Sequence, residues 1–327
     1  MVTAHDTAPV LVTCMKDEGI FLLEWVAYHR AIGFDAVVVN TNNCTDGTDA
    51  ICDRLAELGL IEHVENVVPE GGNPQATAMA RLLARKDIRA RDWLLHIDAD
   101  EFLAVSAGEG RVADLIDTIP PDADVVALHW RSFGNGEALE WEPGNVVETW
   151  TRTTAKPTLR LERHKSMFRP ARFRAAIDHM PKEPVSLPVT VVNSAGAAMP
   201  SKSISHPTRA AYRAGYALAT WENACIHHYA LKTQDVFRLK GVRGHGTGAS
   251  NPKYEIGGKF WRRNRGRGMT DLTALRHLEE MKGILADMRG DARIAELESA
   301  ARDWFLDRRK AMYERDRAAA AAEAGNG

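Results

Sequence analysis

Long apolar runs are missing from this chain of 327 residues. No stretch approaches the ~18 uninterrupted apolar residues of a membrane-spanning helix, and the opening residues lack the basic and apolar segments of a secretory leader. The four cysteines form no Cys-x-x-Cys pair, which argues against a zinc ribbon or a redox dithiol and predicts buried, reduced thiols. From these absences we expect a cytoplasmic protein.

Internal repeats are absent, and low-complexity sequence is confined to the alanine-rich residues 318–327, which we expect to be frayed. Hydrophobic residues make up 45% of the chain and charged residues 26%, which excludes a disordered or fibrous protein. The length allows one large domain or two modest ones. Composition alone leaves enzymes and binding proteins open.

The charge distribution is uneven, although the net charge is only −2. Residues 1–150 carry a net charge of −16, residues 151–270 carry +16, and residues 271–327 carry −2. This pattern fits a site where carboxylates hold a cation and basic side chains meet an anion, and it equally fits two halves that neutralise each other. Nucleic acid fits less well, because aromatic residues are not interleaved with the arginines and the whole chain is slightly acidic.

The first hundred residues alternate short β-branched runs with segments of helical periodicity. This alternation is typical of an α/β fold with a parallel sheet. Strands are predicted at 9–15, 36–40, 60–66 and 93–97, and helices at 21–32, 48–58 and 75–87. Further along, the pattern predicts a strand at 125–130, short strands within 160–200, and helices at 207–224 and 271–317.

An acidic cluster, Asp98, Asp100 and Glu101, directly follows the buried run 93–97. On an extended strand Asp98 and Asp100 would face one side and Glu101 the other. The carboxyl ends of such strands are where open α/β sheets bind ligands, and paired carboxylates suit Mg²⁺ or Mn²⁺ shared with a substrate phosphate. The alternative is a solvated acidic loop. The buried strand before it and the basic half of the chain favour the cation site.

Four segments carry a resemblance to a known family. They are KDEGIFLLEWVAYH at 16–29, NNCTDGT at 42–48, WLLHIDADEF at 93–102 and HYALKTQDVFRLKGVRG at 228–244. In order and spacing they resemble the metal-dependent glycosyltransferases of the GT-A fold, in particular a bacterial family 2-like group related to family 92.

The resemblance implies a Rossmann-like, mostly parallel central sheet flanked by helices, with a C-terminal helical extension. The GT-A domain would span 1–250, with a nucleotide-sugar-binding half (1–105) and an acceptor-side half (106–250). Residues 251–327 would hold a basic loop, the helical extension and the tail. The implied activity is inverting transfer of a hexose-like sugar from a nucleotide sugar to a glycan, lipid-linked or other cell-surface acceptor in polysaccharide biosynthesis. A UDP-sugar is the first candidate for the donor.

The same resemblance implies roles for individual residues. Asp98 and Asp100 would bind Mn²⁺ or Mg²⁺, with His228 as a further ligand. The donor would be bound by residues of the first, second and fourth segments, namely Asp17, Glu18, Asn42, Asp46, Lys232 and Arg243. Thr41 stands where the family usually has Asp, so Asn42 or Asp17 is expected to meet the nucleobase; Cys44 stands where it usually has Ser.

An inverting transfer needs a general base near the acceptor hydroxyl. We expect Asp178 in this role, with Glu101 second; Glu137 and His179 are further candidates. Two tryptophans, Trp130 and Trp141, either stack on an acceptor sugar or pack in the core. Arginines at 262, 263, 265 and 267 form the basic loop, which is expected to close over the diphosphate or to remain solvated.

Two other functions stay open at this point. A noncatalytic nucleotide- or sugar-binding protein would keep the fold without a base. A sugar nucleotidyltransferase would carry a glycine-rich phosphate loop near the first strand, where residues 11–19 hold only Gly19. Peripheral contact with an anionic membrane surface at its inner face fits the basic segment, but the mixed charges of the C-terminal helices argue against a strong membrane anchor.

Overall fold

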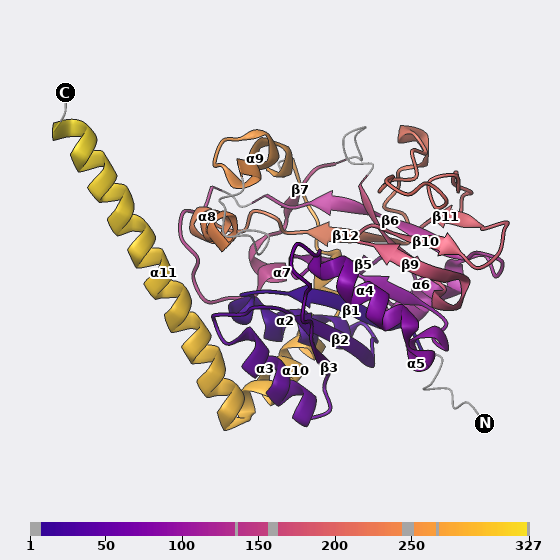
Figure 1. The fold of residues 1–327 in the computed structure, drawn as a ribbon, viewed down its shortest axis with the longest axis horizontal. Coiled ribbons are helices and arrows are strands. Elements are labelled where there is room, and N and C mark those ends of the chain that lie inside the picture. Colours follow the sequence, from indigo (N-terminus) through magenta and orange to yellow (C-terminus); the bar gives the residue numbers. More distant parts are fainter. Residues whose placement is uncertain (1–7, 135–136, 156–162, 244–251, 266–267, 326–327) are drawn as a thin grey trace.

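The computed structural model describes residues 8–134, 137–155, 163–243, 252–265 and 268–325 (Figure 1). In this part of the chain, nine strands form one sheet. Eight of them follow each other across it in the order β3 (Glu62–Glu65), β2 (Ala36–Thr41), β1 (Val10–Met15), β4 (Leu94–His96), β8 (His164–Phe168), β6 (Val125–Ser132), β12 (Ala224–His228) and β5 (Glu101–Val105). The ninth, β11 (Val191–Asn193), pairs with β6.

The sheet is parallel on one side and mixed on the other. Strands β3, β2, β1 and β4 are all parallel, as the alternation of strands and helices predicts. Beyond them, β8 runs antiparallel to both β4 and β6, and β5 runs antiparallel to β12. In the same half, however, β6 runs parallel to both β12 and β11. Most strand pairs of the described sheet are therefore parallel, as expected, and the antiparallel pairs are those of β8 with its two neighbours and of β5 with β12.

Helices cover both faces of the sheet. On one face lie α2 (Gly19–Ala31), α3 (Thr48–Glu57) and α10 (Leu278–Gly290), and on the other lies α4 (Pro74–Ala84). The other helices are α5 (Lys86–Arg89), α6 (Val112–Thr118), α7 (Val146–Thr149), α8 (Gln234–Arg243), α9 (Lys259–Asn264) and α11 (Ala292–Gly325). Two small sheets pair β9 (Phe173–Ile177) with β10 (Met180–Pro184), and β7 (Arg152–Thr153) with β13 (Met269–Thr270).

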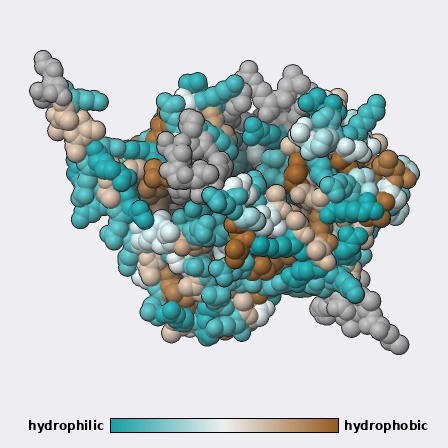
Figure 2. Space-filling model, viewed as in Figure 1, coloured by the Kyte–Doolittle hydropathy of each residue, from teal (hydrophilic) through white to brown (hydrophobic). Residues whose placement is uncertain are grey.

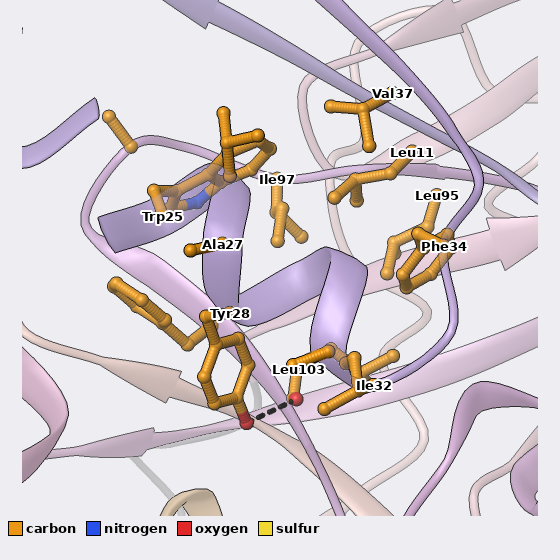
Figure 3. Packing of buried hydrophobic residues seen from close by; sticks show 14 of the residues in the cluster. Leu11, Trp25, Ala27, Tyr28, Ile32, Phe34, Val37, Leu95, Ile97 and Leu103 are labelled. Carbon is orange, nitrogen blue, oxygen red and sulfur yellow. Dashed lines mark hydrogen bonds between the residues drawn. The ribbon is translucent and has the colours of Figure 1, made fainter. Parts of the chain in front are cut away.

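Helix α2 ties the core to the start of β5 (Figure 3). The Trp25 indole Nε1 donates to the Glu101 carbonyl at 2.9 Å, and the Tyr28 hydroxyl donates to the Leu103 carbonyl at 2.8 Å. Both side chains are buried in the hydrophobic core, and the Tyr28 ring packs against Phe102 of β5 with 5.1 Å between the ring centroids. The apolar and aromatic motif of residues 21–29 is therefore structural, and it fixes the strand that begins directly after Asp98 and Asp100.

The helix predicted at 207–224 is wrong. Apart from a 3-10 turn at Tyr216–Leu218 the segment is irregular, and β12 begins at Ala224. The Lys182 ammonium donates to the carbonyls of Ser203, His206 and Arg209, so these carbonyl groups are held by a side chain in an irregular loop. Lys182 lies 21 to 27 residues before the carbonyl groups that it binds, so local periodicity could not predict these contacts.

The C-terminal region also differs from expectation. Helix α11 continues to Gly325 and projects from the body of the molecule (Figure 1). The prediction of a frayed tail is therefore wrong as far as the described residues extend. Alanine has the highest helix propensity, which explains why the low-complexity segment stays helical. Where the structure describes the chain, its helices are either too short or too polar to cross a bilayer. The face seen in Figure 2 is mainly hydrophilic, with small scattered apolar groups.

Candidate active site

A cleft of about 620 Å³ opens where β1, β2 and β4 end. Its walls come from segments far apart in the sequence. One wall holds Glu18, Asn42 and residues 71–75, which lead into α4. Asp98, Asp100 and His228 form what we call the floor, and the remaining lining, which we call the second wall, comes from Trp130, Arg163, Asp178, His179, Lys253, Tyr254 and Phe260.

The acidic residues lie on a turn between β4 and β5 instead of on an extended strand. The Glu101 N–H donates to the Asp98 carbonyl at 3.0 Å, and the Glu101 carboxylate Oε2 accepts from the Asp98 N–H at 2.9 Å. The Glu101 side chain is 0% exposed, and burial raises the pKa of its carboxyl group well above the usual range. Glu101 therefore shapes the turn from below and does not reach the cleft, so it is no longer a candidate base.

Asp100 and His228 meet on the cleft floor. The Asp100 carboxylate Oδ2 lies 3.7 Å from His228 Nε2 and accepts a hydrogen bond from the Lys240 ammonium of α8. Burial opposes the charge on Asp100, but Lys240 and His228 outweigh it, so the pKa of this carboxyl is well below its usual range. Burial lowers the pKa of His228 to about 3, so the imidazole is neutral at pH 7.

Asp98 points to a different set of partners from Asp100. Its Oδ1 accepts from Gln75 Nε2 at 2.8 Å and its Oδ2 accepts from Lys165 Nζ at 3.2 Å. The two aspartates line the same cleft, as the sequence predicts. They do so with different partners, because Glu101 folds the backbone into a turn through its bonds to Asp98.

The side chains of Asp100 and His228 on the cleft floor suit a divalent cation that takes two ligands from the protein. A carboxylate and a neutral imidazole 3.7 Å apart, both buried, suit Mn²⁺ better than Mg²⁺. No group of three or more His, Cys, Asp or Glu side chains is arranged around one point within the described residues. Asp98 therefore does not complete a three-ligand cage, and further ligands would have to come from a bound phosphate or water.

Asp178 and His179 lie at the turn between β9 and β10, and Asp178 is close to Asp98, because the Lys165 ammonium contacts both carboxylates. The Asp178 side chain is 32% exposed, and its Oδ2 lies 3.3 Å from His179 Nε2. His179 Nδ1 lies 3.0 Å from the His164 carbonyl, which can only accept, so Nδ1 carries the proton and Nε2 is free to accept one. The expected base thus reaches the cleft with a second proton acceptor beside it.

Two of the predicted donor-binding acids hold the loops together. Asp46 is buried; its Oδ2 accepts from the Gly19 N–H at 2.7 Å and its Oδ1 from the Thr48 N–H at 2.9 Å. Asp17 Oδ1 accepts from the Thr45 N–H at 2.6 Å. Neither lines the main cleft, whereas Glu18 and Asn42 do. Of the two residues expected at the nucleobase, Asn42 is the better placed.

The predicted basic residues divide in the same way. Lys240 lies on the cleft, whereas Lys232 lies 4.4 Å from the centre of the Phe21 ring and lines an adjoining cavity of about 240 Å³, which shares Lys16, Glu18 and Lys240 with the cleft. Arg243 ends α8, and its side chain is outside the described part of the structure. Lys232 still acts on the site at longer range, because its charge contributes to the low pKa of Asp100.

The expected closing loop is in part the helix α9. Arg262 donates to the Gly257 carbonyl, and Arg265 pairs with Glu137, so neither arginine lines the cleft and Glu137 is not placed as a base. The side chain of Arg263 and the whole of Arg267 lie outside the described residues. Trp141 packs between Phe21 and Phe305 in the core, whereas Trp130 forms part of the cleft wall.

Several cleft residues were not predicted. Gln75, Lys253, Tyr254 and Phe260 come from segments without a recognisable motif, and only the fold brings them together. Lys165 lies beneath the cleft and was not predicted either. A buried strand interrupted by a lysine was the available signal.

Comparisons with known proteins agree with part of the resemblance. No family model matches the chain. It is 27% identical over 175 residues to a glycosyltransferase family 92 protein of Ricinus communis, covering 51% of this chain and 29% of that protein. It is also 27% identical over 163 residues to a family 92 protein of Oryza sativa subsp. japonica, covering 48% and 26%. The chain thus spans less than a third of the length of these relatives, both of which are plant proteins.

Solved structures of glycosyltransferases are similar at a lower level. The apo bifunctional glycosyltransferase WbbM is 17% identical with a TM-score of 0.26, over 39% of this chain and 24% of that chain. Residues 1–349 of S. aureus TarS, solved in complex with UDP, are 18% identical with a TM-score of 0.32, over 50% and 47%. The sequence similarity to the two family 92 proteins confirms the part of the expectation that named this family.

Proposed function

We propose that this protein is a metal-dependent glycosyltransferase that moves a sugar from a nucleotide-sugar donor, a UDP-sugar first, to a glycan or lipid-linked acceptor. One observation carries the proposal: the buried Asp100 and His228 lie side by side on the floor of a cleft that the partly exposed Asp178 also lines. The likeness to family 92 over about half of the chain supports the same activity.

The donor would lie along the β1–β2–β4 side of the cleft. Glu18, Asn42 and residues 71–75 line this side, which we call the donor wall and assign to the nucleoside. Lys16 and Lys240 line the adjoining floor and would contact the two phosphates through charge-assisted hydrogen bonds. A divalent cation held by Asp100 and His228 would act there as a Lewis acid, which neutralises charge on the departing nucleoside diphosphate.

The acceptor would enter beside Trp130. Asp178 would take the proton of the attacking hydroxyl at Oδ2. His179 Nε2, 3.3 Å from this oxygen, is placed to share that proton. The proposed outcome is inversion, which requires the acceptor to bind so that Asp178 and the leaving group lie on opposite sides of the sugar.

A donor screen tests the proposal. The purified protein is incubated with Mn²⁺ and a panel of nucleotide sugars, and released nucleoside diphosphate is measured with and without cell-surface glycans and lipid-linked sugars. Release that depends on Mn²⁺ and rises with an acceptor is the expected result. Binding of UDP without release would favour the noncatalytic alternative, and formation of a nucleotide sugar from sugar phosphate would favour a nucleotidyltransferase.

Replacing Lys240 by Met is expected to change cation and nucleotide binding in opposite directions. An ammonium group and a divalent cation repel each other at the same carboxylate, so removal of the ammonium should tighten Mn²⁺ binding several-fold. The same change removes a charge-assisted bond to phosphate, which should weaken UDP binding about 10-fold. Calorimetric titration with Mn²⁺, then with UDP at saturating Mn²⁺, measures both. Lys310→Met, an exposed lysine of α11, is the control, and equal Mn²⁺ affinities would contradict the prediction.

Replacing His228 by Gln is expected to raise the Mn²⁺ concentration for half-maximal activity by about 10-fold, the usual effect of weakening one metal contact. The imidazole also packs against the Trp130 ring, with 4.2 Å between the ring centroids. A purely packing role would instead lower the melting temperature and leave the Mn²⁺ dependence unchanged. A metal titration of activity and a melting curve on the same sample separate these outcomes.

A further inference from the structure

Lys165 is a lysine with no exposed surface directly beneath the cleft. It lies on β8, between β4 and β6, and its Nζ extends toward the cleft floor. The ammonium donates to Asp98 Oδ2 at 3.2 Å, to the Asp178 carbonyl at 3.3 Å and to the Asp178 carboxylate Oδ1. Glu101 Oε2 lies 3.4 Å away. The three ammonium protons therefore all have partners on the two turns that carry Asp98 and Asp178.

We propose that Lys165 is a positioning residue of the transfer site, whose ammonium holds the donor-side carboxylate of Asp98 and the acceptor-side carboxylate of Asp178 in one fixed arrangement. This inference rests on the proposed function. It assigns a task to a residue that touches neither substrate and that the motif comparison leaves without a role.

Stability alone does not account for this lysine. Burying an ion pair costs desolvation that is often larger than the attraction gained, and apolar residues of similar size are commonly as stabilising or more so. Methionine would fill the same space between β4 and β6. The partners are also informative, because Asp98 and Asp178 both line the cleft, whereas a lysine that served the core would have no need of them.

The ammonium acts on Asp178 in two ways. It occupies Oδ1, so that Oδ2 is the oxygen left to face the cleft and His179. It also sets the charge: burial would raise the pKa of the Asp178 carboxyl, but Lys165 on β8, with His179 beside it and His96 on β4, holds this pKa below its usual range. Asp178 is thereby kept ionised and ready to accept a proton even in mildly acidic solution.

The ammonium also couples the two sides of the reaction. Asp98 is fixed between Lys165 and Gln75, and Gln75 lies at the start of α4, on the donor wall. A shift of Lys165 would therefore move the base and a donor-side carboxylate relative to each other. Misplacement of this kind slows the chemical step while leaving the donor's own contacts in place.

The test compares Lys165→Met with Lys182→Met, which replaces another buried lysine whose ammonium donates only to the backbone carbonyls of residues 203, 206 and 209. Kinetics use the nucleotide sugar that gives the largest release in the donor screen. For Lys165→Met we expect kcat to fall about 10- to 100-fold with a donor KM within about 3-fold of wild type. We also expect the acid limb of the pH profile of kcat/KM to move upward by about one unit or more. Lys182→Met should lower the melting temperature and leave the acid limb in place.

A second variant keeps the positive charge, so the inference can be tested even if Lys165→Met does not fold. Lys165→Arg should keep the acid limb near its wild-type position and still lose kcat, because the charge remains while the reach of the side chain changes. Wild-type kcat in Lys165→Arg, or an unmoved acid limb in folded Lys165→Met, would overturn the inference and leave the proposed function standing. Absence of donor turnover in the wild-type protein would overturn the proposed function, and this role with it.

Discussion

Asp100→Asn is expected to abolish Mn²⁺ binding and to lower donor turnover by about 100- to 1000-fold, the usual cost of removing one electrostatic contact to a developing charge. Asparagine keeps the shape of the side chain but removes the charge on which both His228 and Lys240 converge. The fold should remain intact, since the backbone carbonyl of Asp100 still accepts from the Tyr229 N–H at 2.8 Å. Lys240 is partly exposed and can turn to solvent.

Asp92→Asn is the matched control, because this exposed aspartate lies just before β4, at the opposite end of the same strand. Both proteins are stripped of metal, titrated with Mn²⁺ by calorimetry, and assayed for nucleoside diphosphate release. Their melting curves should coincide with the wild-type curve. Full activity of Asp100→Asn at defined Mn²⁺ concentrations would remove Asp100 from the proposed metal site.

Most of the fold up to β4 could be predicted from the sequence, because its elements have strong periodicity and clear boundaries. Gly33 ends the predicted helix with a φ of 101°, a positive value that glycine adopts without the steric strain of other residues. The second half was less predictable. The antiparallel pairing of β5 with β12 joins residues 101–105 to residues 224–228, and nothing local in either segment identifies the partner.

The sequence predicted which acidic residues belong to the region of the site, but not which of them face the cleft. Asp98, Asp100 and His228 from the motifs line the cleft, and so does Asp178, which was expected as the base. Asp46 and Glu101 come from the same motifs, but they accept hydrogen bonds from the backbone inside the protein. A motif shows that a carboxylate is wanted at a position, and only the three-dimensional structure shows whether it faces a ligand or the backbone.

The charge asymmetry of the sequence also acquires a physical meaning. Lys165 and Lys240, from the basic part of the chain, meet Asp98 and Asp100 from the acidic part at the cleft floor. The two interpretations of the asymmetry are therefore not exclusive. The halves neutralise each other at this site, and a substrate phosphate could take over the lysine that a cation displaces from Asp100.

Asp178→Asn is expected to lower kcat by about 100- to 10,000-fold, the range for loss of a general base, without impairing UDP binding. The amide cannot take the proton of the acceptor hydroxyl. In the proposed site Asp178 does not contact the nucleotide, so the affinity for UDP with Mn²⁺ should stay within a few-fold of wild type. Lys165 keeps Asp98 and Glu101 as partners, so the protein should remain folded.

His179→Gln separates the two proton acceptors in the second wall. Because His179 supports Asp178 in the proposed mechanism, its loss should cost less than that of Asp178 itself. Rates with the best donor, UDP titrations and melting curves are compared for both variants, with the exposed Asp122→Asn as the control. If His179→Gln shows the larger loss of kcat, the histidine is the base and Asp178 orients it. If Asp178→Asn instead loses UDP binding with kcat intact, the carboxylate belongs to the donor site, and the acceptor must approach from another wall.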